Sequence, residues 1–273
     1  MTSVTREGLV AASNISAALT ELGVGRGHCI IVHSSLSSLG FVEGGADTVI
    51  DACLDTLGPA GTLVMPTLCQ RRGGERFARW NIRTSPSDVG RITEVFRKRR
   101  EVIRSDHATH SVAAFGPLAG TITSGHGAAH GRPGPWGDAA FATNSPWQRL
   151  YDVGARAVLI GVTFRVLTFV HLIEHLIVER RLACLNDSRR NALLRNVQGY
   201  ERPGVWPYFN RDRLQREAEY RGLVRKTRCG DSTLMGCHAP SIVDLALRLM
   251  EQDPTSWFRN DFAEWYRHTG ECP

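Results

Sequence analysis

The feature of this 273-residue chain that most constrains its fold is the alternation of short apolar runs with segments of helical spacing. Residues 29–32 and 61–65 are short apolar runs that are typical of buried strands. Residues 46–57, between them, have helical spacing and are followed by the breaker pair Gly58-Pro59. This alternation predicts an α/β fold, a layered sandwich in which helices flank a central mixed or parallel sheet.

The same patterns predict the remaining elements. Helices are expected over 6–22, 87–99, 167–180 and 242–250, a short helix from Ser145-Pro146, and strands over 111–115 and 155–162. Residues 125–137 contain five glycines and two prolines, which indicates an irregular binding loop or lid. The pattern over 184–226 is weaker and more polar. Because no repeat or linker interrupts the chain, we expect a single domain over residues 1–273.

Composition narrows the classes of protein to consider. No apolar run reaches about 18 residues and the N-terminal residues lack a basic-then-apolar pattern, so we expect neither a membrane span nor a secretory signal. The seven cysteines form no C-x-x-C pair, which favours reduced, buried thiols, among them Cys29, Cys53 and Cys184, in a cytoplasmic protein. The net charge is +6, but acidic residues interrupt the basic blocks, so we expect no nucleic-acid partner. A monomer or homodimer is expected.

Thr168, His171 and Glu174 are the strongest candidates for catalysis. Their spacing of three places them on one face of the helix expected over 167–180. A carboxylate beside an imidazole fixes its tautomer and raises its basicity, and a nearby hydroxyl can donate to an oxyanion. The alternative is a half-buried helix with a hydrogen-bonded structural histidine.

A zinc site is another interpretation of the same helix. His171-x-x-Glu174-His175 matches the H-x-x-E-H pattern of zinc hydrolases, in which two histidines bind the metal and the glutamate is the base. The third ligand has no supporting pattern, although Glu217 and Glu251 are candidates. A zinc hydrolase therefore stays an alternative.

Two polar segments can bind a phosphorylated carrier. Residues 33–40 form a hydroxyl-rich turn after an apolar strand, where backbone N–H groups and serines can hold phosphate oxygens. Residues 104–111 combine Arg104 with histidines and serine hydroxyls, and this arginine can pair with a phosphate. Each segment can equally be a solvated polar loop.

These segments together resemble the aminoglycoside N3-acetyltransferase family, whose fold differs from that of the common GNAT acetyltransferases. The resemblance extends from about Val32 to Leu247. The matching motifs are His33-Ser34-Ser35-Leu36, Gly44-Gly45, residues 61–67, Arg104-Ser105, residues 110–116, Ser145-Pro146 and Thr168-x-x-His171-x-x-Glu174.

The resemblance implies acetyl-CoA-dependent N-acetylation of an aminoglycoside or related amine-bearing antibiotic, a resistance activity that needs no metal. It implies that His171 is the general base, that Glu174 orients it, and that Thr168 steadies the oxyanion. The implied walls of the coenzyme A site are His33, Ser34, Ser35, Leu36, Arg104, Ser105, His110 and Ser111.

Some residues depart from the family pattern. Ala108 follows His107 where family members commonly have proline, and Arg165 brings a cation into the turn before Thr168. Residues 70–79 hold four arginines, although a polycationic aminoglycoside needs acidic walls. An acceptor amine that carries a carboxylate, phosphate or phosphonate is therefore an alternative, as is a non-catalytic protein that only binds coenzyme A.

Overall fold

The computed structural model describes residues 9–69, 78–127, 131–183 and 185–270. Its centre is a mixed seven-stranded sheet with the order β5-β6-β4-β2-β7-β9-β8. The strands are β2 (Cys29–Ser34), β4 (Thr62–Pro66), β5 (Ile103–Arg104), β6 (Val112–Phe115), β7 (Arg156–Ile160), β8 (Val224–Cys229) and β9 (Ser232–His238). Strand β2 runs parallel to β4 and β7, and the other pairs are antiparallel. The expected α/β sandwich with a mixed sheet is confirmed.

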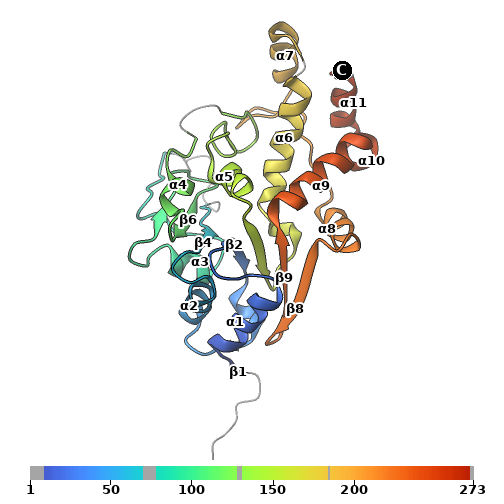
Figure 1. Cartoon of the computed structure of the whole chain (residues 1–273). Helices are drawn as coiled ribbons and strands as arrows, with labels where there is room; N and C mark the ends of the chain where they lie inside the picture. Colours follow the sequence, from blue (N-terminus) through green and yellow to red (C-terminus); the bar gives the residue numbers. More distant parts are fainter. Residues whose placement is uncertain (1–8, 70–77, 128–130, 184, 271–273) are drawn as a thin grey trace, which may run out of the picture.

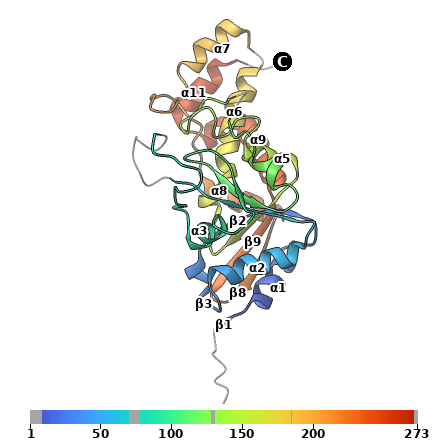
Figure 2. The same ribbon diagram turned by 90° about the vertical axis from the view of Figure 1, so that its left-hand side faces the viewer.

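Helices cover both faces of this sheet (Figures 1 and 2). They are α1 (Ala12–Glu21), α2 (Ala46–Leu57), α3 (Arg91–Phe96), α4 (Ala119–Thr123), α5 (Pro146–Asp152), α6 (Phe169–Ala183), α7 (Asp187–Leu194), α8 (Arg211–Tyr220), α9 (Ala239–Gln252), α10 (Pro254–Trp257) and α11 (Asn260–His268). Two 3₁₀ turns, η1 (Leu36–Leu39) and η2 (Phe164–Val166), and a small parallel pair, β1 (Leu9–Val10) with β3 (Phe41–Val42), complete the described elements. In both views α7 and α11 lie at the end of the molecule away from α1.

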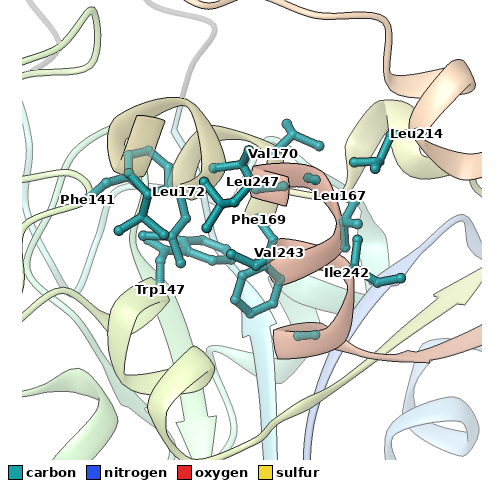
Figure 3. Packing of buried hydrophobic residues seen from close by; sticks show 14 of the residues in the cluster. Phe141, Trp147, Leu167, Phe169, Val170, Leu172, Leu214, Ile242, Val243 and Leu247 are labelled. Atoms are coloured by element: carbon teal, nitrogen blue, oxygen red, sulfur yellow. The ribbon is translucent and has the colours of Figure 1, made fainter. Parts of the chain in front are cut away.

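Two hydrophobic clusters, one on each face, hold these layers together. Cys29 and Ile31 of β2 pack into the cluster that contains α4, α5, α6 and α9, while Ile30 and Val32 pack into the cluster with α1 and α2. Since successive residues of a strand point to opposite faces, a strand covered on both sides is continuously apolar. Figure 3 shows part of the first cluster, in which Trp147 of α5 packs with side chains of α6 and α9.

The element predictions were accurate where apolar residues dominate. The helix over 46–57 is α2 to the residue, and the strand over 155–162 is β7. The helix expected over 87–99 is shorter in the structure. It is α3, and residues 87–90 before it are not helical. Residues 6–8 of the first expected helix lie outside the described residues, and α1 begins at Ala12.

The polar stretch after residue 184 holds more structure than its pattern indicated. It contains α7, α8 and the hairpin of β8 and β9. Strand β8 is at the edge of the sheet and reads VRKTRC, with most of its side chains exposed or half-buried. Edge strands commonly carry such charges, which discourage pairing with other chains and also remove the apolar alternation that predicts a strand.

The expected burial holds for most of the described cysteines, although Cys69 is half-buried. Cys29 and Cys53 are buried free thiols, and burial raises the pKa of each to about 12. Cys184 lies outside the described residues. No helix within the described ranges is both long and apolar enough to cross a membrane.

Candidate active site

A cavity of about 380 Å³ opens where three parallel strands end. Because β2, β4 and β7 run in the same direction, their carboxyl ends meet at one edge of the sheet, which is where α/β proteins usually bind ligands. Its lining residues are His33, Ser34, Pro66, Leu68, Val89, Thr93, Val162, Arg165, Val166, Leu167, Thr168, His171 and Arg211.

His171 and Glu174 form a hydrogen-bonded pair on the first two turns of α6. Nδ1 of His171 lies 2.9 Å from Oε2 of Glu174, and Nε1 of Trp206 donates to the same oxygen at 2.9 Å. Glu174 is only 1% exposed. An ionised carboxylate only accepts hydrogen bonds, so Nδ1 carries the imidazole proton. Nε2 of His171 is then the ring nitrogen that can accept a proton, on a residue that lines the cavity.

Thr168 immediately precedes α6 and is not part of the helical face expected for it. Its amide N–H donates to Nε2 of His33 at 3.2 Å, and its hydroxyl lies 3.2 Å from the same nitrogen. Burial lowers the pKa of His33 to about 4, so this imidazole is neutral at physiological pH. Because Nε2 already accepts the amide hydrogen, the Thr168 hydroxyl keeps a proton that it can donate into the cavity.

His33 therefore holds Thr168 in place through a hydrogen bond, and the next residue, Ser34, also lines the cavity. The hydroxyl oxygen of Ser34 is buried, and the structure gives it no hydrogen-bond partner among the described residues. A groove of about 460 Å³ continues from Ser34. It is lined by Ser34, Ser35, Leu36, Ser37, Gly40, Phe41, Val42, Gly45, Gly90 and Arg91. The predicted residues of the first motif thus line either the cavity or this groove.

The second predicted segment, residues 104–111, is buried except for Asp106, and none of its residues lines the cavity. The guanidinium of Arg104 is buried, donates to the carbonyls of Thr67 and Ser85, and lies 4.5 Å from the Trp80 ring centroid. Ser111 donates to the same Thr67 carbonyl. Because Arg104 donates to backbone carbonyls, it stabilises the loops that it joins. In the part of the chain that the structure describes, its guanidinium does not face a site where a phosphate could bind.

Ser105 and His110 belong to the same interior network. The Ser105 hydroxyl accepts from the Val112 amide at 3.0 Å and lies 3.0 Å from Nδ1 of His126. His110 is fully buried, and its ring centroid is 5.6 Å from that of His171. Burial and the neighbouring histidines keep the pKa of His110 well below its usual value. His110 thus packs against His171 as a neutral ring.

The two histidines of the H-x-x-E-H pattern have different surroundings, since His171 lines the cavity and His175 is buried against aromatic rings. Nδ1 of His175 lies 2.7 Å from the backbone oxygen of His171, and the ring packs 4.8 Å from the rings of Phe141 and Trp206. Burial lowers the pKa of His175 to about 3. Within the described residues, no group of three or more His, Cys, Asp or Glu side chains is placed to hold a metal ion. The spacing of these residues is explained by the packing of α6, in which His175 and Glu174 are both buried.

Two further predicted regions fall partly outside the described residues. Residues 70–77 of the arginine-rich segment and residues 128–130 of the glycine-rich loop are not described. Trp136, in the described part of that loop, lies 5.0 Å from His171, ring centroid to centroid. The indole nitrogen of Trp136 is buried and has no partner among the described residues.

The sequence patterns missed Trp206 and Arg211, which both contact the pair of His171 and Glu174. Nη2 of Arg211 lies 3.4 Å from Nε2 of His171. Both residues are more than thirty positions from the pair in sequence, in a stretch with weak periodicity. No local signal marks such contacts, because folding alone brings them together.

Comparison with known proteins identifies the family. The family model described as aminoglycoside 3-N-acetyltransferase matches residues 31–251, so the chain belongs to this family. Aminoglycoside N(3)-acetyltransferase VII of Streptomyces paromomycinus is 30% identical over 187 residues, which cover 62% of this chain and 62% of that protein. The alignment thus leaves more than a third of that relative's length unmatched.

Solved structures share the fold at lower identity. The apoenzyme of aminoglycoside acetyltransferase AAC(3)-IVa superimposes with a TM-score of 0.69 at 22% identity, covering 95% of this chain and 98% of that one. AAC-IIIb, solved as a binary complex with CoASH, gives a TM-score of 0.67 at 21% identity, covering 89% and 97%. These likenesses confirm the antibiotic N-acetyltransferase fold.

Proposed function

We propose that this protein transfers an acetyl group from acetyl-CoA to an amino group of an aminoglycoside. The observation that carries the proposal is the hydrogen-bonded pair of His171 and Glu174 on the wall of a cavity, in a chain of this family. An amine attacks a thioester only in its neutral form, so a base beside the acceptor is required. The names of the relatives, which are aminoglycoside acetyltransferases, support the acceptor class.

Each polar group of the site has a role in this reaction. His171 accepts the proton of the attacking amine at Nε2, while Glu174 holds the ring in the required tautomer and stabilises the imidazolium that forms. The Thr168 hydroxyl donates a hydrogen bond to the carbonyl oxygen as that oxygen gains negative charge. His33 acts through Thr168, because its Nε2 accepts the amide hydrogen of that residue.

The cavity and its groove suit a long cofactor such as coenzyme A. The unpartnered hydroxyl of Ser34 lies where the two meet and can donate to the pantetheine arm. Ser35, Ser37 and Arg91 line the groove and offer donors and a positive charge to phosphate groups. A structural neighbour that binds CoASH supports this cofactor. Arg104, Ser105, His110 and Ser111, which we expected to bind the cofactor, act in this proposal as support for the loops around it.

An anionic acceptor is a second candidate, because the described cavity lining includes Arg165 and Arg211 and no carboxylate. The charge of Arg165 is compensated by Asp212, whose oxygens lie 2.9 and 3.0 Å from its Nε. Arg211 has no such partner in the described residues. An acceptor that carries a carboxylate, phosphate or phosphonate near its amine can therefore pair with this guanidinium.

Mass spectrometry of reaction mixtures tests the proposal and separates the two acceptors. Purified protein is incubated with acetyl-CoA and either apramycin or an aminoalkyl phosphonate, and products are screened for the added acetyl group. We expect acetylated apramycin, formed equally in the presence of a metal chelator. Turnover of the phosphonate alone would replace the aminoglycoside by the anionic acceptor, and no turnover of any amine would refute acetyl transfer.

We further infer a single domain in a cytoplasmic protein. One sheet with a hydrophobic cluster on each face supports the first inference, and buried free cysteines support the second.

A further inference from the structure

Arg211, the first residue of α8, contacts the nitrogen that the proposed mechanism needs. Its Nη2 lies 3.4 Å from Nε2 of His171, and its Nη1 donates to the backbone oxygen of Arg165 at 2.7 Å. Since Nδ1 of His171 carries the ring proton, Nε2 is an acceptor and the guanidinium is its donor. An amine cannot give its proton to Nε2 while Arg211 occupies that position.

The Nη1 atom of Arg211, which donates to the Arg165 carbonyl, is held more firmly than the Nη2 atom near His171. Arg165 forms a two-oxygen ion pair with Asp212, the next residue along α8, so the start of this helix is fixed against η2. The second nitrogen of the guanidinium reaches the imidazole only through a long hydrogen bond. Arg211 can therefore turn about the Arg165 carbonyl without unfolding the start of α8.

Arg211 also brings an uncompensated positive charge to the cavity. Its described partners are a carbonyl and an imidazole, neither of which carries a negative charge, and no carboxylate is among the described lining residues. Negative charge develops in acyl transfer on the oxygen of the thioester carbonyl, where a guanidinium in a partly enclosed site stabilises it strongly.

We propose that Arg211 is a catalytic residue with two positions: it caps the base in the free protein and donates to the carbonyl oxygen during transfer. This rests on the proposed acetyl transfer. The amine nitrogen bonds to the carbonyl carbon, the carbonyl π pair moves to oxygen beside Arg211, and His171 takes the amine proton. When the oxygen returns its electron pair, the carbon–sulfur bond breaks and the thiolate leaves with the proton held by His171.

Turnover by Arg211→Met and Arg211→Lys tests the catalytic position. With acetyl-CoA and apramycin we expect Arg211→Met to lower kcat by about 10²-fold, the usual loss when one oxyanion donor is removed. Arg211→Lys keeps the charge and retains part of the rate. Arg216→Met removes an exposed charge from the same helix and serves as the control with normal kcat. A normal kcat for folded Arg211→Met would overturn the proposal.

Modification of the free protein tests the cap without any acetyl transfer. Diethyl pyrocarbonate acylates unprotonated imidazole nitrogen, and peptide mass spectrometry measures its rate at His171. We expect faster modification in Arg211→Met than in the wild type or Arg216→Met, with Arg211→Lys in between. Equal rates in all folded variants would refute the cap. Because this readout needs no substrate, it separates failure of the cap from failure of the proposed function.

Discussion

The segments 168–174 and 104–111 both contain predicted site residues, yet the structure uses them differently. Thr168 and His171 line a cavity, where the Thr168 hydroxyl keeps a proton that it can donate and Nε2 of His171 is met only by a long contact from Arg211. Arg104 and Ser111 are buried, and their donors serve backbone carbonyls of neighbouring loops. Polar composition alone does not mark a functional segment; an available donor or acceptor on a cavity wall does.

Removing the base should have the largest effect. His171→Ala deletes the proton acceptor, so we expect kcat for acetyl transfer to fall by about 10²- to 10⁴-fold with the fold intact. Steady-state thiol release from acetyl-CoA measures this rate. His238→Ala, at an exposed histidine, is the control. A near-normal rate in His171→Ala would mean that the segment 168–174 has no larger role in catalysis than the segment 104–111.

The orienting carboxylate should have the next largest effect. Glu174→Gln keeps the shape of the side chain, but its amide can no longer stabilise an imidazolium at His171, so we expect kcat to fall by about 10²-fold. Glu251→Gln, which removes a half-exposed partner of Arg180, is the matched control. Equal rates for the two variants would mean that the hydrogen bond to His171 is only structural.

Two arginine substitutions test the comparison directly, since both remove one positive charge. Arg104→Met leaves buried carbonyls without donors, so we expect a loss of about 2–3 kcal/mol in the free energy of unfolding and an unchanged KM for acetyl-CoA. Arg91→Met, at an exposed residue of the groove, should leave stability unchanged and raise this KM by about threefold to tenfold. Urea unfolding and initial-rate kinetics measure the two quantities. The reverse pattern would place the coenzyme phosphates beside Arg104.

The interior histidines should make stability depend on pH. Burial lowers the pKa of His107 to about 4 and that of His126 to about 3, while both return to about 6.5 in the unfolded chain. The unfolded chain therefore binds more protons below pH 6.5, and stability falls as the pH drops from 6.5 towards 4. Melting temperatures across this range measure the slope, and His126→Gln should make it shallower. An unchanged slope would mean that His126 is not held neutral by the fold.

The sequence predicted the layered fold and the pair of His171 and Glu174 because both depend on local patterns. Apolar runs define β2, α2 and β7, and helical spacing of three brings the imidazole to the carboxylate. It could not show that Arg104 faces inward, since a polar side chain gives no sign of whether its partners are solvent or carbonyls. Nor could it show Trp206 and Arg211 at the base, because those contacts form only when distant segments fold together.

A crystal structure with coenzyme A and an aminoglycoside tests the central claim most directly, through the distances from Nε2 of His171. We predict that the acceptor amine lies within about 3.5 Å of this nitrogen, with the coenzyme sulfur beside it in the cavity and Arg211 turned away. A sulfur bound far from His171, or an acceptor amine directed at another residue, would contradict the account.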